Sequence, residues 1–511
     1  MKKEKIITLL NFGSRVAEEE MEHLQDYFVE TDNWSRFLNG DIDIVYGAKG
    51  SGKSAIYLLL LKNKENLYKS KNTVILNAEH LRGKTAFAQL EVDPPTSEVE
   101  FISLWKLYFV TLIANYFSEN GIKASFLRDF KDAGLIKQEA DLSELVSGIS
   151  RIIRNFRGPK ALEAGTVHDP RTGQSEFFTR IVLDKSKKEI SSTAFDGFLS
   201  EINKICQSKN LNFWIALDRL DVAFSDNLEL EANAIRALFR VYLDLNGYSQ
   251  IKLKLFVRTD IWQKITEIGF REGSHLTRSF IIEWTKEDII ALILNRVFKT
   301  KDIRSFYNIN GKIGLEKPKE RERLFYKLFP PRVEGGKDSK KTDTITWIIS
   351  RTQDGSRNPA PREIIHLLTE ARNEQVKSIE SGGRLPTKTK LLDSFTFRNA
   401  LPKVSKVRTE QSLYSEFPRL KSYIVKLENE KTEQSIGSLS KIWQCTKQDA
   451  IKCAEELISI GFFERRGAKD APLYWIPFVF RSALRLVQGK SEFRRKKAPK
   501  KKVIKKKIKR K

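Results

Sequence analysis

The octapeptide Gly47-Ala48-Lys49-Gly50-Ser51-Gly52-Lys53-Ser54 constrains the fold of this chain more than any other feature. It satisfies the G-x-x-x-x-G-K-[ST] pattern, and it lies between a short β-rich stretch at 41–46 and an apolar helix start at 55–60. This order of strand, loop and helix lets backbone N–H groups and the positive end of the helix dipole bind phosphate oxygens. All eight residues are therefore expected to bind ATP, with Lys53 reaching the β- and γ-phosphates and Ser54 holding Mg²⁺.

Size and charge narrow the class of protein. A chain of 511 residues is expected to form about three domains, and 40% hydrophobic residues suffice for buried cores. The formal net charge is +26, of which residues 491–511 supply 13 − 1 = +12 and the rest 26 − 12 = +14. This excess favours a polyanionic partner, nucleic acid before an anionic membrane, although part of it could serve solubility alone.

The cysteines and the N-terminus indicate a reducing compartment. The three cysteines are odd in number, far apart and without a C-x-x-C pairing, so neither a disulfide framework nor a zinc site is predicted. The first apolar stretch, Ile6 to Leu10, is too short for a signal peptide. No stretch reaches the ~18 apolar residues of a membrane span, so we expect a cytoplasmic protein without a membrane partner.

Strand-like and helix-like segments alternate in the first half of the chain. Buried strands are predicted at 74–77, 212–217 and 252–257, and helices at 98–117, 195–206 and 233–245. This alternation is typical of a parallel α/β sheet. Residues 120–190 are mixed and rich in turns, which indicates an insertion. Upstream, we expect Tyr27, Phe28 and Trp34 to pack on the first strand; bordering the nucleotide base is the alternative.

An acidic residue ends the second predicted core strand. The run Phe213-Trp214-Ile215-Ala216-Leu217-Asp218 places a carboxylate where a phosphate-loop NTPase holds its Mg²⁺. Arg219 follows and cannot accept a proton, so hydrolysis would need Asp221 or another carboxylate and should be slow. A structural ion pair between Asp221 and Arg219 is the alternative.

A polar cluster also ends the next strand. Thr259 in Phe256-Val257-Arg258-Thr259-Asp260 is the predicted γ-phosphate sensor, with Arg258 as a second candidate. The competing interpretation is that Thr259 and Asp260 only cap the following helix.

The segments 274–280 and 284–293 resemble the region after the sensor strand in the origin-recognition and initiator branch of AAA+ ATPases. Asn358-Pro359-Ala360-Pro361-Arg362-Glu363 resembles the lid-helix start of that branch and of its STAND relatives. As a whole, the chain is similar over roughly 10–490 to bacterial origin-recognition-like P-loop ATPases. The strand ends Leu-Asp-Arg-Leu-Asp at 217–221 and Arg-Thr-Asp at 258–260 carry most of this likeness.

The resemblance implies two further arginine roles. Arg278 would contact the nucleotide of a neighbouring subunit as an arginine finger, unless it is a surface cation. Arg362 would be the second sensor, which couples the lid to the γ-phosphate, unless it is only a helix-start arginine. The family usually has Glu after the strand-end Asp, so Arg219 puts the speed of catalysis in doubt without weakening nucleotide binding.

Three predicted helices, at 410–428, 438–443 and 447–460, precede two short strands at 462–466 and 473–476. This pattern indicates a winged helix and resembles the C-terminal domain of the same branch. A DNA-binding winged helix would place three residues of the third helix in the major groove and three residues of the hairpin on phosphates: Lys447, Gln448 and Lys452, and Arg465, Arg466 and Lys469. Such domains also serve as protein-docking modules.

The expected architecture is an α/β P-loop NTPase of AAA+-like type. Its expected parts are an N-terminal helical segment, a core, a helical lid, a linker, a winged helix and a disordered lysine-rich tail, at 1–40, 41–284, 285–375, 376–405, 406–489 and 490–511. The tail would bind nucleic acid without sequence preference, and salt would weaken that binding steeply.

The expected function is an ATP- and Mg²⁺-dependent switch of AAA+/STAND type that binds nucleic acid, DNA more readily than RNA. Replication or plasmid initiation, mobile-element targeting and anti-phage defence are compatible roles. An oligomerising scaffold that recruits an effector protein encoded nearby through the winged helix is the alternative, and a homo-oligomer fits both. A third alternative is a protein that binds nucleotide without useful turnover.

Overall fold

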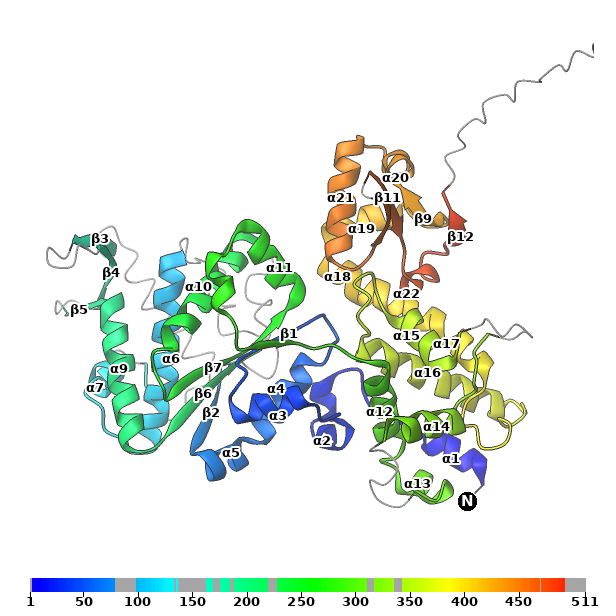
Figure 1. Cartoon of the computed structure of the whole chain (residues 1–511), viewed down its shortest axis with the longest axis horizontal. Coiled ribbons are helices and arrows are strands. Elements are labelled where there is room, and N and C mark those ends of the chain that lie inside the picture. Colours follow the sequence, from blue (N-terminus) through cyan, green and yellow to red (C-terminus); the bar gives the residue numbers. More distant parts are fainter. Residues whose placement is uncertain are drawn as a thin grey trace, which may run out of the picture. The chain divides into compact units, whose positions relative to one another are not determined.

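Figure 1 shows the computed structural model of the chain. It describes residues 2–78, 98–132, 135–136, 162–168, 175–183, 188–218, 228–309, 317–334, 342–468 and 470–491. Contacts divide the chain into two compact units, residues 13–299 and residues 1–12 with 300–511. The first of these units is called the core unit and the second the helical unit.

The core unit is built on a five-stranded, all-parallel sheet. Its strand order is β2-β6-β7-β1-β8, with the bounds β1 Ile44–Gly47, β2 Thr73–Asn77, β6 Asn212–Leu217, β7 Ile251–Arg258 and β8 Ser279–Ile281. One strand, β7, thus separates the phosphate-loop strand β1 from the acid-bearing strand β6. This arrangement is the AAA+ type of P-loop fold, as the sequence predicted.

Helices cover both faces of this sheet (Figure 1). On one face Ile44, Phe213 and Leu255 pack against α6 Glu98–Glu119, α9 Ser192–Ser208 and α10 Leu228–Leu245. On the other face Val45 and Phe256 pack against α3 Asp32–Asn39 and α4 Lys53–Lys62. Because successive residues of a strand point to opposite faces, burial of both faces explains why these strands are continuous apolar runs in the sequence.

Helix α6, predicted at 98–117, is buried on nearly all sides, including Trp105 and Tyr108, so it is a core helix. It is the one helix of the described residues long and apolar enough to cross a membrane, over Phe101–Glu119, but 83% of that window is buried inside the protein. Its composition therefore reflects packing in the core.

The remaining elements of the core unit surround the sheet. The expected insertion contains α7 Leu127–Asp132 and an antiparallel sheet of β3 Leu162–His168, β4 Ser175–Leu183 and β5 Lys188–Ser191. The others are η1 Ala17–Glu20, α2 Leu24–Tyr27, α5 Lys64–Lys71, α11 Thr259–Ile268, η3 Arg271–His275 and α12 Lys286–Val297.

The segment before β1 is packed into the core unit. Trp34 contacts the rings of Phe28 and Phe37, with centroid distances of 5.2 and 6.0 Å. Glu20 forms a buried bidentate ion pair with Arg296 of α12, at 2.7 and 3.0 Å. These aromatics therefore pack on the core, as expected.

The helical unit combines the chain's first helix with its C-terminal half. Helix α1 Lys3–Leu9 packs on α16 Pro361–Glu380 and α13 Lys301–Phe306. The other helices before the C-terminal domain are α14 Pro318–Leu328, α15 Thr344–Thr352 and α17 Ser394–Val407. The expected N-terminal segment 1–40 is therefore divided: residues 1–12 belong to the helical unit, and the rest belongs to the core unit.

The stretch 376–405, expected to be a linker, is largely helical. It holds the end of α16 and most of α17, which packs along α16 through the buried residues Phe397, Ala400 and Val404. A buried apolar stripe at helical spacing overrides the polar composition of the preceding residues.

The C-terminal domain, residues 408–491, follows directly. Its elements are η4 Arg408–Leu413, α18 Tyr414–Glu416, α19 Pro418–Val425, β9 Lys431–Ser435, α20 Ile436–Trp443, α21 Lys447–Ser459, β10 Glu464–Ala468, β11 Ala471–Trp475, α22 Phe478–Arg481 and β12 Val487–Lys490. Its sheet has the order β10-β11-β9-β12. The helix expected at 410–428 is broken before Pro418, which lacks an N–H to continue it.

Candidate nucleotide site

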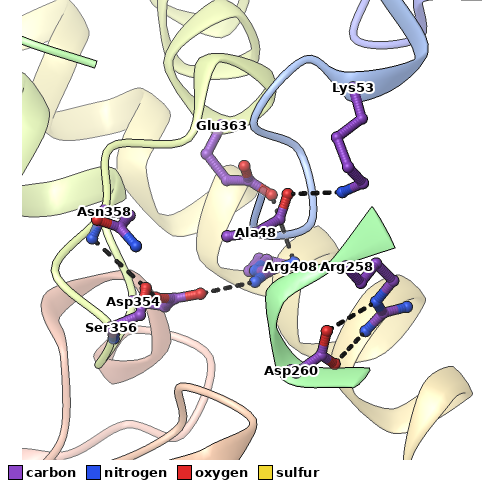
Figure 2. A network of polar contacts seen from close by, with 9 residues as sticks. All are labelled: Ala48, Lys53, Arg258, Asp260, Asp354, Ser356, Asn358, Glu363 and Arg408. Carbon is purple, nitrogen blue, oxygen red and sulfur yellow. Dashed lines mark hydrogen bonds and ion pairs between the residues drawn. The ribbon is translucent and has the colours of Figure 1, made fainter. Parts of the chain in front are cut away.

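The phosphate loop joins the end of β1 to the start of α4. Gly50 and Gly52 have φ angles of +77° and +106°, which only glycine adopts without strain. Lys53 Nζ donates to the carbonyl oxygen of Gly47 at 2.9 Å. It also donates to that of Ala48 at 3.1 Å (Figure 2). The lysine ammonium therefore lies against the carbonyl groups of the loop that is expected to bind phosphates.

The loop also offers unsatisfied polar groups. Ser51 is 3% exposed, and its Oγ is buried with no hydrogen-bond partner among the described residues. A Cβ on Gly47 would lie 2.3 Å from this Oγ, so any other residue there would force the Ser51 side chain to move. An orphaned hydroxyl beside an ammonium and a helix N-terminus fits a phosphate group, whose oxygens accept hydrogen bonds.

The expected Mg²⁺ ligands come from two elements. Ser54 lies in the first turn of α4, and its hydroxyl makes no hydrogen bond within the described part of the chain. Asp218 follows β6 and is 5% exposed. A hydroxyl and a carboxylate at the carboxyl edge of a parallel sheet are ligands that suit Mg²⁺. Arg219 and Asp221 lie outside the described residues, so the role of Asp221 stays a prediction.

The sensor cluster lies directly beside the phosphate loop. Gly47 of β1 pairs with Arg258 of β7 in the sheet register. Arg258 contacts Asp260 through two hydrogen bonds of 3.1 and 2.7 Å (Figure 2), while the Thr259 hydroxyl makes no hydrogen bond to any described residue. Burial alone would raise the pKa of Asp260, but Arg258 outweighs it and the pKa is lowered. Arg258 is thus bound to Asp260, whereas the Thr259 hydroxyl is available to a ligand as far as the described residues are concerned.

Arg278 lies at the opposite, amino edge of the sheet. Its Nε donates to Asp43 Oδ2 at 2.6 Å, just before β1 begins, and it also donates to the Gly40 carbonyl. Because the phosphate loop follows the other end of β1, Arg278 is far from the nucleotide site of its own chain. A finger that acts on a neighbouring chain stays a prediction.

Arg362 begins helix α16 of the helical unit, behind Pro361. Its guanidinium has no hydrogen-bond or ion-pair partner among the residues that the structure describes. Its role as second sensor stays a prediction.

The loop that leads to Arg362 is tied to the C-terminal domain, a feature that sequence reasoning missed. Gly355 N–H donates to the Gly461 carbonyl at 2.6 Å, and Arg357 pairs with Glu464 of β10 at 2.5 Å. Asp354 accepts from Arg408 at 3.1 Å and from Ser356 (Figure 2). These partners lie up to 107 positions apart in the chain, so no local pattern could have shown them.

Trp284 was also missed as a site residue. Its indole Nε1 donates to the Ser51 carbonyl at 2.7 Å, which fixes the middle of the phosphate loop from the segment after β8. The sequence places Trp284 in the family-like stretch but gives no sign of this contact.

The basic residues of the C-terminal domain divide over two faces. Lys447, Gln448 and Lys452 are exposed on α21, and Arg465 pairs with Glu455 of that helix. Arg466, the next residue of β10, points to the other face, where its guanidinium lies 3.7 Å from the centre of the Trp475 ring. Lys469 lies outside the described residues.

Comparisons with known proteins add limited information. No family model and no curated protein matches the chain. Two solved structures of the Aeropyrum pernix ORC2 protein are similar. The ADPNP–ADP complexes match at 11% identity with a TM-score of 0.35, over 94% of each chain. The ADP form matches at 10% identity with a TM-score of 0.27, over 94% of this chain and 98% of that one.

The class of fold follows from the strand order of the core sheet and from the phosphate loop. The core unit has an AAA+-like P-loop fold, and its phosphate loop, the acid after β6 and the polar residues after β7 lie on adjoining parts of one sheet edge.

Proposed function

We propose that the protein is an ATP-dependent switch whose nucleotide state controls the binding of nucleic acid. The observation that carries this proposal is the phosphate loop, where the buried Ser51 hydroxyl lacks a partner in the described part of the chain and lies in the same loop as the Lys53 ammonium. Lys53 would bind the β- and γ-phosphates, and Ser54 and Asp218 would hold Mg²⁺, which would neutralise phosphate charge.

Hydrolysis is proposed to be slow. The residue after Asp218 is Arg219, which cannot accept a proton from an attacking water. Asp221 is the remaining carboxylate in that stretch. ATP occupancy would then persist long enough to act as a signal, with turnover as its reset.

The route from nucleotide to C-terminal domain is proposed to run through the loop before α16. The Arg362 guanidinium has no partner among the described residues, and the loop before it is fixed to the C-terminal domain through Gly355 and Arg357. If Arg362 contacts the γ-phosphate, then any displacement of its loop must displace that domain too.

Nucleic acid is proposed to contact the exposed face of α21 and the lysine-rich tail. The three helices α19, α20 and α21 with the hairpin β10–β11 have the order of a winged helix, whose third helix enters the major groove. Lys447 and Lys452 are exposed on that helix. The +12 charge of residues 491–511 (13 − 1) would add affinity without sequence preference.

Nucleotide binding is tested by titrating ATP with Mg²⁺ into the wild-type chain, Lys53→Ala and Lys64→Ala, which removes an exposed lysine at the start of α5. We expect Lys53→Ala to weaken ATP binding at least ~100-fold, the loss of about two charge-assisted contacts, and Lys64→Ala to have no effect. Unchanged binding by Lys53→Ala would refute the proposal. The rates of ATP hydrolysis of two further variants, Asp218→Asn and Asp221→Asn, identify the carboxylates that support hydrolysis.

DNA binding is tested by a salt series on the full chain and on a chain that ends at Ser491. The shorter chain should bind more weakly and with a smaller salt slope, since each lost phosphate contact removes about 0.9 from that slope. Lys447→Ala/Lys452→Ala should weaken DNA binding by the shorter chain further. Lys204→Ala/Lys209→Ala, an equal charge change at exposed positions in α9 and just after its end, should not. If the chain that ends at Ser491 binds no DNA at all, the proposed role of α21 is wrong.

A scaffold that recruits a partner protein is the second candidate. Ile451 is 43% exposed in the middle of the proposed DNA face of α21, where an apolar side chain suits a protein partner better than phosphates. Absence of ATP-dependent DNA affinity in the chain ending at Ser491 would favour this candidate.

A further inference from the structure

A pocket of about 480 Å³ lies between the C-terminal sheet and helix α15, entirely within the helical unit. Its lining includes Arg466 of β10, Trp475 of β11, Phe478 and Arg481 of α22, and Lys490 of β12. None of these residues takes part in the phosphate loop. The volume lies within the ~300–1,000 Å³ of small-molecule sites.

The pocket gathers guanidinium groups on aromatic rings. Arg466 lies 3.7 Å from the Trp475 ring centre, and Arg481 lies 4.6 Å from Trp475 and 3.9 Å from Phe478. Arg351 of α15, next to the lining residue Ser350, lies 3.6 Å from the centre of the Phe478 ring. Stacking holds each guanidinium plane in place, so its N–H groups at the ring's edge are pre-oriented toward a ligand.

The positive charge of the pocket is only partly compensated. Arg466 pairs with Glu464, Arg351 with Glu334, and Lys490 contacts Glu433 at 3.4 Å. Arg481 has no ion pair among the described residues: its Nε donates to the Ile476 carbonyl, and its second terminal nitrogen, Nη2, is buried without a partner. A buried guanidinium nitrogen without an acceptor is costly, and an anion would satisfy it.

The other arginines add to this cost. Burial lowers the pKa of Arg481 to about 10, and the positive charges of Arg351 and Arg466 act in the same direction. The three cations therefore repel one another, and an anion placed between them would relieve that repulsion.

We propose that this pocket binds one nucleotide unit, with its phosphate on Arg481 and Arg466 and its base beside the aromatic cluster. Arginine forks match phosphate geometry, and a base can stack on a guanidinium plane or an aromatic ring. The unit could be a free nucleotide or part of a nucleic-acid strand. The position of Lys490 favours the strand, because the lysine-rich residues 492–511 continue the chain from this rim.

This site is independent of the proposed ATP site and of the α21 face. Arg465 and Arg466 are adjacent on β10 and point to opposite faces, Arg465 toward Glu455 of α21 and Arg466 into the pocket. A matched pair of substitutions on one strand can therefore separate the two faces.

The test measures binding of thymidine monophosphate, the dinucleotide pTpT and inorganic phosphate to the full chain, since thymidine avoids competition with an adenine site. Arg481→Gln and Lys490→Gln should each weaken binding of a thymidine ligand, the first by tenfold or more. Arg465→Gln should change it less than twofold. Lys490 is exposed, so its variant tests the site without disturbing the fold.

Tighter binding of pTpT than of the monophosphate identifies a strand as the source, and equal binding identifies a free nucleotide. The proposal is overturned if no thymidine ligand binds at millimolar concentration, if phosphate alone binds as tightly, or if Arg481→Gln and Lys490→Gln bind like the wild-type chain. Repeating the titration in Lys53→Ala keeps the result separate from that of the ATP site, because binding should persist there.

Discussion

Single buried charges show how the core unit accommodates its polar residues. Lys254 is fully buried in the middle of β7, where its Nζ contacts Asp43 at 2.8 Å and lies 4.0 Å from the centre of the Trp214 ring. Burial lowers the pKa of Lys254 to about 8 from 10.5, although Asp43 opposes the shift. Folding therefore has to overcome an unfavourable desolvation of this ammonium at neutral pH.

The pH dependence of stability follows from this lowered pKa. Between about pH 8 and 10.5 the unfolded chain retains the Lys254 proton longer than the folded chain does, so the lysine's contribution to the free energy of unfolding rises with pH. Urea unfolding gives the free energies of unfolding of the wild-type chain and of Lys254→Met. The wild-type value should rise relative to the Lys254→Met value by about 1 kcal/mol per pH unit above pH 8. A difference that stays flat from pH 7 to 9.5 would contradict this account.

The Glu20–Arg296 pair is the second case at this scale. Both side chains are almost completely buried, at 5% and 6% exposed, and Arg296 also lies 4.4 Å from the centre of the Tyr27 ring. Glu20→Gln should lower the free energy of unfolding by roughly 3–5 kcal/mol, since it leaves a buried guanidinium unpaired. The double variant Glu20→Gln/Arg296→Met should recover part of that loss in urea unfolding. A loss below about 1 kcal/mol in the single variant would show that water reaches Arg296.

At the scale of elements, the sequence predicted the strands whose own residues form an apolar run. The strands β6 and β7 were recognisable because both of their faces are buried and their residues form apolar runs. The edge strand β2 is only partly buried, but its run Val74-Ile75-Leu76 is also apolar. The order β2-β6-β7-β1-β8 could not be predicted from any one segment, because it depends on pairing between strands that are far apart in the chain. Helix α17 was overlooked although its buried stripe was readable, because the polar residues 381–390 suggested that the linker continued.

Close backbone contact makes Gly355 sensitive to substitution at the junction of its loop with the C-terminal domain. A Cβ there would lie 2.2 Å from the Phe463 carbonyl oxygen and 2.9 Å from that of Gly461, and both are backbone atoms that cannot rotate away. Gly355→Ala should therefore destabilise the helical unit by roughly 1–3 kcal/mol and speed hydrogen exchange of the N–H bonded to Gly461.

Gly197 provides the matched control for this substitution. It is exposed within α9, and an added Cβ would meet nothing within 4 Å. Gly197→Ala should therefore stabilise the chain by about 0.5–1 kcal/mol through helix propensity. Equal effects of the two alanines would contradict the contact at Gly355.

At the scale of the whole molecule, the candidate site was partly predictable. The phosphate loop and Asp218 were identified because their spacing and neighbours are specific, and the structure places them on one edge of the core sheet. The bond from Trp284 to Ser51 and the pairing of Arg357 with Glu464 join residues far apart in the chain. Those contacts depend on tertiary packing, so a single sequence could not reveal them.

The switch proposal depends on one coupling, between ATP at the phosphate loop and DNA at the C-terminal domain. The most direct measurement is the affinity of the chain ending at Ser491 for a fluorescent duplex at fixed salt, with ATP, with ADP and without nucleotide. The account predicts a difference of at least ~5-fold between ATP and ADP, the lower range of allosteric coupling, which Lys53→Ala abolishes and Lys64→Ala retains. Equal affinity in all three states, in a chain shown to bind ATP, would contradict it.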